Sequence, residues 1–168
     1  MTQQADVALL KFLIAQVEAA ANSQDSEWED EERHAIDSTE PSVMCRTIAD
    51  IASRLNLMHL AALYLARAAE LSRNPDTRLV LLDSAYKHAL SPKPIHLDLA
   101  VTIGMRIVVV SCEALRACPA AIDALQKLAD EYPGYPNLAE FILEHRERSP
   151  RLANIGGLAT ITTNEKSR

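Results

Sequence analysis

Aromatic residues and glycine are both scarce in this sequence, and their scarcity restricts the fold. Only 4% of the 168 residues are Phe, Trp or Tyr, and only four are glycine. A β-sheet protein depends on aromatic and β-branched side chains and on many tight turns. Alanine and leucine dominate instead, and both favour helices. We therefore expect an all-α protein whose helices pack closely through small side chains.

Long apolar segments are missing as well. The longest apolar run, LAVTIGMRIVVV at 99–110, contains Arg106 and is too short to span a bilayer. The run VALLKFLIA near the start contains Lys11 and follows Asp6 rather than a basic cluster, so it is not typical of a secretory signal. These features predict a cytoplasmic protein that does not enter the membrane.

The chain also lacks a basic surface segment. Its net charge is −6, and the segment 22–42 alone holds eight acidic residues against one basic residue, Arg33. The remainder is close to neutral. Because nucleic-acid binding needs a basic footprint, nucleic acid is not an expected partner. The segment 22–42 is interpreted as an acidic connection that suits a basic protein surface.

Apolar residues recur at helical spacing through most of the chain. We expect helices over 5–21, 76–90, 95–116, 119–132 and 136–148, and a short acidic helix over 26–37. The segment from Val43 to Ser72 contains no Pro or Gly, so it is either one long helix or two that bend near Asn56. The pair Asn74-Pro75 is typical of a helix start. The stripe expected to be buried on the first helix consists of Leu10, Leu13, Ile14, Val17 and Ala21.

Short connections make consecutive helices antiparallel neighbours. The predicted architecture is therefore seven or eight antiparallel helices in stacked hairpins. We expect one domain over 1–149 and a flexible tail over 150–168.

Two segments have the residue spacing of a helical repeat. Small and large residues alternate before a proline in both, at Leu82, Tyr86, Ala89 and Pro94, and again at Ala121, Leu125, Leu128 and Pro133. The first-helix packing positions of the second unit fall on Met105, Val108, Val109 and Cys112. This pattern, with LAALY at 60–64, resembles the tetratricopeptide repeat over residues 58–135. Plain α-hairpins share such spacing, so a repeat-like array and an orthogonal bundle are both retained.

The resemblance implies a concave face that binds a peptide or a helix. Independently, the predicted helices 57–71 and 97–112 are apolar nearly all round, which favours self-association or a groove for a partner. We therefore expect a non-enzymatic protein–protein interaction module, such as an adaptor, a chaperone-like protein or an inhibitor. We also expect a homodimer. The predicted partner contacts are Trp28, Glu29, Glu31, Tyr64, Arg67, Tyr86 and His88.

Two other functions are retained as alternatives. Residues 47–70 resemble a helix-turn-helix with Asn56 at the turn, although the second helix offers few polar groups to read DNA. The second alternative is a small helical enzyme or ligand-binding protein. Glu31 and His34 form only one Glu-x-x-His motif, whereas a di-iron bundle needs two. No catalytic, cofactor-binding or metal-binding residue is predicted.

The three cysteines have no metal-ligand spacing. They lie in apolar helical sequence, and we expect them to be buried thiols in a reducing compartment. They are Cys45, Cys112 and Cys118.

Overall fold

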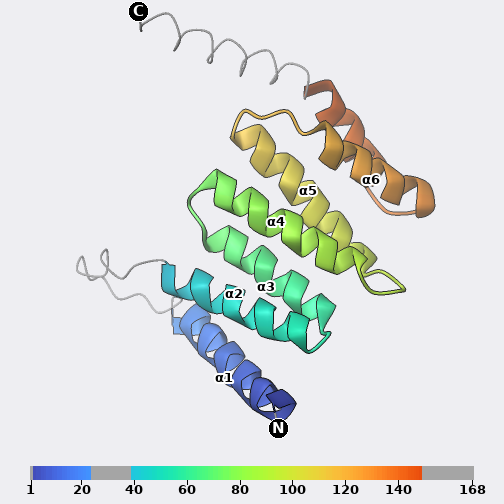
Figure 1. Cartoon of the computed structure of the whole chain (residues 1–168). Coiled ribbons are helices and arrows are strands. Elements are labelled where there is room, and N and C mark those ends of the chain that lie inside the picture. The colour runs from blue at the N-terminus through green and yellow to red at the C-terminus, as the bar shows by residue number, and fades with distance from the viewer. Residues whose placement is uncertain (1, 24–38, 149–168) are drawn as a thin grey trace, which may run out of the picture. The chain divides into compact units, whose positions relative to one another are not determined.

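The computed structural model describes residues 2–23 and 39–148. The chain divides into two compact units, Met1–His96 and Leu97–Arg168, and each is described by itself. The regular structure of the described residues is entirely helical, so the predicted all-α class is confirmed (Figure 1). Most of the acidic segment 22–42 and the whole tail 150–168 lie outside the described residues.

The first unit contains four helices, α1 (Thr2–Ser23), α2 (Thr39–Arg54), α3 (Met58–Leu71) and α4 (Pro75–Leu90). Each packs on the next, α1 on α2, α2 on α3 and α3 on α4 (Figure 1). Helix α3 is therefore covered on two sides, by α2 and α4. Among the described helices, α1 packs closely on α2 alone. This difference in coverage governs which apolar residues remain at the surface.

A tight turn at Asn56 separates α2 from α3. Leu57 N donates to Ala52 O at 2.8 Å, and Asn56 N donates to Ser53 O at 3.0 Å. These two bonds are those of a Schellman turn, in which the residue after the helix adopts a left-handed conformation. Asn56 has φ 60°, which asparagine tolerates better than most residues. The sequence had allowed one long helix or two, and two are present.

The start of α4 follows the expected capping pattern. The Asn74 side chain accepts hydrogen bonds from Asp76 N at 2.8 Å and Thr77 N at 3.3 Å. Pro75 occupies the first helical position, where its missing N–H costs nothing. The predicted N-cap is confirmed.

The second unit contains α5 (Leu97–Glu113), α6 (Pro119–Glu131) and a further helix over 138–148. Residues 107–110 are all β-branched, a composition that is common in strands. They nevertheless lie within α5. The helix predicted over 95–116 ends earlier, at Glu113, where Leu115 turns the chain with φ 54°. An ion pair of 3.6 Å between Arg146 and Asp123 joins 138–148 to α6.

The tetratricopeptide resemblance and the single domain over 1–149 stay predictions. What the structure describes is consecutive packing of helices into hairpins within each unit.

Candidate functional site

The outer face of α1 carries an exposed apolar surface. Phe12 is 60% exposed and Leu9 is 46% exposed, although both lie in the middle of the helix. On a helix of 3.6 residues per turn, the residues within about 60° of Phe12 form one continuous face. We call this face the α1 stripe, and its residues, all exposed, are Ala5, Ala8, Leu9, Phe12, Ala15, Gln16 and Ala19.

The α1 stripe contains no charged residue. Lys11 and Glu18, both exposed, lie on one flank of it. On the opposite side of the helix, Leu10 and Val17 are buried at 5% and 4% exposure. Helix α1 therefore has two apolar faces, one packed in the first unit and one at its surface.

An ion pair fixes α1 on its neighbour. The Arg54 guanidinium, at the end of α2, lies 3.2 Å from the Asp6 carboxylate near the start of α1. The pair is partly exposed and adds little stability, but it joins the ends of these helices. The α1 stripe is consequently presented by a helix that is held to α2 near its start.

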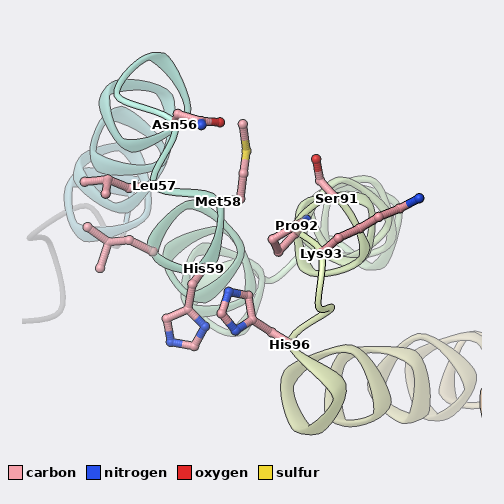
Figure 2. Close-up of a pocket in the computed structure, with 9 residues that line it drawn as sticks. Asn56, Leu57, Met58, His59, Ser91, Pro92, Lys93 and His96 are labelled. Atoms are coloured by element: carbon pink, nitrogen blue, oxygen red, sulfur yellow. The ribbon is translucent and has the colours of Figure 1, made fainter.

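A pocket of about 630 Å³ lies elsewhere in the first unit (Figure 2). It is lined by residues 56–60, around the start of α3, and by Ser91, Pro92, Lys93 and His96 after α4. The rings of His59 and His96 lie side by side, with centroids 4.4 Å apart and planes tilted by 54°. Lys93 extends away from this imidazole pair (Figure 2). The pocket has the size of a small-ligand site.

The polar side chains that line this pocket include two imidazoles. The two imidazoles can donate and accept hydrogen bonds, and the lining contains no carboxylate. No group of three His, Cys, Asp or Glu side chains suited to a metal ion is found among residues 2–23 and 39–148. The sequence did not point to this pair, since His59 and His96 are far apart in the chain and meet only through tertiary packing.

The predicted contacts on α3 are less exposed than an open groove requires. Tyr64 is only 5% exposed, and burial raises the pKa of its hydroxyl, with Glu18 adding to the rise. Arg67 is half-buried and acts electrostatically on both Tyr64 and Cys45. The structure thus brings Tyr64 and Arg67 together within the packed part of the unit. Their contact with a partner stays a prediction.

The predicted contacts on α4 are half-buried, and His88 has a defined structural role. His88 Nδ1 lies 2.8 Å from Ser84 O, and Nε2 lies 3.3 Å from Ser53 Oγ on α2. The imidazole therefore links α4 to α2. Tyr86 lies two residues earlier on the same helix and also has interaction partners. Trp28, Glu29 and Glu31 lie outside the described residues.

Sequence reasoning passed over the α1 stripe. The only signal for it was that apolar residues of 5–21 fall on both sides of the helix, at Phe12 and Leu9 as well as at Leu10 and Val17. That signal identifies an apolar face, but not whether a neighbouring helix covers it.

The described helices define an all-α fold, and within the first unit α1 is apolar on the face that the other described helices leave exposed. A scan of protein-family models, a search of curated proteins and a search of solved structures each find no match to this chain. No helix within 2–23 or 39–148 combines the length and apolar character needed to cross a membrane.

Proposed function

We propose that this protein is a non-enzymatic protein–protein interaction module that self-associates, the α1 stripe of one copy packing on that of a second. The observation that carries the proposal is the exposure of Phe12, at 60%, in the centre of an uncharged helix face. Exposed apolar patches of this kind are typical of interaction surfaces. An aromatic side chain at the centre of a patch is the residue type that most often dominates binding energy.

The composition of the stripe suits a helix as its occupant. Alanines at 5, 8, 15 and 19 surround the two large side chains, Leu9 and Phe12. Small residues let a second helix approach closely, and large ones then fill the grooves between its side chains. Burying these groups removes apolar surface from water, which is the main driving force for association.

A second copy of α1 is the partner that fits the pattern. Phe12 lies near the middle of Thr2–Ser23, and the stripe is similar in both directions from it, except that Leu9 on one side corresponds to Ala15 on the other. Ala5 and Ala19 are each seven residues from Phe12, and Ala8 and Gln16 are each four residues away. Two antiparallel α1 helices related by a two-fold axis at Phe12 would therefore match small residues with small or medium ones. Such self-complementarity is what an isologous interface requires.

The flanking charges support the same arrangement. Lys11 and Glu18 lie on one flank of the stripe. In the antiparallel pair, Lys11 of one copy lies on the same flank as Glu18 of the partner subunit. Opposite charges at the rim of an apolar interface favour this orientation over the parallel one.

The exposure of α3 favours this function over DNA reading. A groove-reading helix needs several exposed polar or basic side chains. The exposed residues of α3 are His59, Leu63, Glu70 and Leu71. Packing between α2 and α4 takes up the rest of the helix surface.

Sedimentation equilibrium across a range of micromolar concentrations tests the proposal. We expect the native chain to form dimers, and Phe12→Lys to raise the dissociation constant on the order of 30-fold or more, the loss typical of a central interface residue. Lysine is a good helix former, so α1 should persist. Val80→Lys is the matched control, because Val80 is 69% exposed on α4, outside the stripe. It should leave the dimer unchanged.

Two results would contradict the proposal. A native chain that stays monomeric at high micromolar concentration would exclude a second copy as the occupant of the stripe. Equal weakening by Phe12→Lys and Val80→Lys would show that association does not use α1. Circular dichroism of each variant, showing native helix content, separates these outcomes from loss of folding.

A further inference from the structure

The turn between α5 and α6 folds the chain back on itself. After Glu113, Leu115 N donates to Cys112 O at 3.0 Å and Arg116 N donates to Ser111 O at 2.8 Å. Leu115 has φ 54°, the left-handed conformation that completes a Schellman turn. Cys118 then stands at the N-cap of α6, directly before Pro119. The turn returns the chain to the last turn of α5.

As a result, two thiols that are six residues apart in sequence are in contact. The side chains of Cys112 and Cys118 share a hydrogen bond. Cys118 makes no capping bond to the α6 backbone, although serine or asparagine would normally do so at that position. Cys118 is buried at 7% exposure, whereas Cys112 is half-buried and more open to solvent. The pair thus has one accessible and one protected sulfur.

We infer that Cys112 and Cys118 are a site of reversible oxidation, forming an intrachain disulfide by exchange with a low-molecular-weight disulfide such as oxidised glutathione. The inference depends on the contact between the two side chains and on their unequal exposure. Cys45 lies on α2 in the other unit and is fully buried, so it is not expected to react.

The exchange proceeds in two balanced steps. The Cys112 thiolate attacks one sulfur of oxidised glutathione, forms a mixed disulfide and releases a glutathione thiolate. The Cys118 thiol then loses its proton to solvent, and its sulfur attacks the Cys112 sulfur of the mixed disulfide. A Cys112–Cys118 bond forms, and a second glutathione thiolate leaves. The protein loses two hydrogen atoms, and the glutathione disulfide is reduced to two thiols.

The environment of Cys118 predicts a slow second step at neutral pH. Burial, together with the neighbouring Cys112 thiol, raises the pKa of Cys118 to about 11. Cys112 is the titratable group that acts on it. Because the thiolate is the attacking form and burial disfavours it, the rate of ring closure should rise with pH between pH 8 and 10. A resolving thiol with an ordinary pKa would level off within this range.

The test uses the full chain incubated with oxidised glutathione, then quenched, unfolded and digested for mass spectrometry. We expect the peptides containing Cys112 and Cys118 to be joined with the loss of two hydrogen atoms, and Cys45 to remain free. Dithiothreitol should reverse the link. Cys118→Ser should stop at a glutathione adduct on Cys112, and Cys45→Ser should close as the native chain does.

Three results would overturn the inference. These are a glutathione adduct on Cys112 that persists in the native chain at pH 10, a link that involves Cys45, or three free thiols after prolonged exposure. A ring-closure rate that does not change between pH 8 and 10 would contradict the role of Cys118 as the resolving thiol. The native chain itself is the sample in each measurement, so loss of folding in a variant does not affect these outcomes.

Discussion

Helices α1 and α3 are both apolar on most sides, yet they differ in what covers them. Helix α3 lies between α2 and α4 and buries six residues, including Ala61, Tyr64 and Leu65. Helix α1 packs on α2 alone among the described helices and buries Leu10 and Val17. Its opposite face leaves Phe12 exposed at 60%. A helix that is apolar all round indicates an interface only when its neighbours in the same unit leave a face uncovered.

The proposed self-association uses α1 rather than α3. From sequence alone, the helix over 57–71 was interpreted as too apolar for a lone subunit. In the structure, its two neighbours account for that composition. Helix α1, which the sequence presented as an ordinary amphipathic helix, carries the uncovered face instead.

The largest effect should come from a covered residue of α3. Leu65 is 8% exposed, so Leu65→Ala removes buried methyl groups and leaves a cavity. We expect the free energy of unfolding in urea to fall by about 3 kcal/mol. Phe12→Ala, measured at a protein concentration below association, should change it by no more than about 0.5 kcal/mol. Similar losses from the two substitutions would break the distinction between α1 and α3.

A matched pair of leucines isolates the role of the stripe. Leu9 on α1 and Leu63 on α3 are almost equally exposed, at 46% and 45%. Leu9→Lys should raise the dissociation constant of the dimer about tenfold, close to 1.4 kcal/mol, because the charge enters an apolar interface. Leu63→Lys should leave association unchanged in the same sedimentation experiment. A reversed order would move the interface to α3.

The smallest effect concerns the link that runs from α4 to α2. His88→Ala removes the hydrogen bonds to Ser84 O and Ser53 Oγ, and we expect a loss of about 1 kcal/mol in unfolding free energy. A double-mutant cycle with Ser53→Ala should give a coupling energy of a few tenths of a kcal/mol or more. Zero coupling would show that the imidazole does not connect the helices. Dimerisation should be unaffected in both variants.

Local signals in the sequence predicted the helices well. The Asn74-Pro75 cap and the burial of Leu10 and Val17 depend on residues within one or two turns of each other. The other three residues expected in the buried stripe of the first helix, Leu13, Ile14 and Ala21, are half-buried. The break at Asn56 was one of two options, because asparagine can end a helix without forcing it to end. The end of α5 was placed too late, since Leu115 is not a residue whose type announces a left-handed turn.

The candidate sites were not predictable in the same way. The α1 stripe is exposed because no other described helix covers it. The His59–His96 pair forms because packing across a loop brings the two rings together. The Cys112–Cys118 contact forms because the chain turns at Leu115. Each is a property of how elements meet rather than of one element's pattern. Residues chosen by type, such as Tyr64 and His88, proved to lie within the packed unit.

The most direct test of the account is the register of α1 against α1 in the dimer. In an antiparallel pair centred on Phe12, residue 8 of one copy faces residue 16 of the other, whereas two residues 8 are about 12 Å apart along the axis. A mixture of Ala8→Cys protein and Gln16→Cys protein should therefore form a disulfide between positions 8 and 16 on mild oxidation, with the link mapped by mass spectrometry. Each variant alone should link far more slowly. Faster linking of Ala8→Cys protein with itself, or no excess linking in the mixture, would contradict the antiparallel pairing.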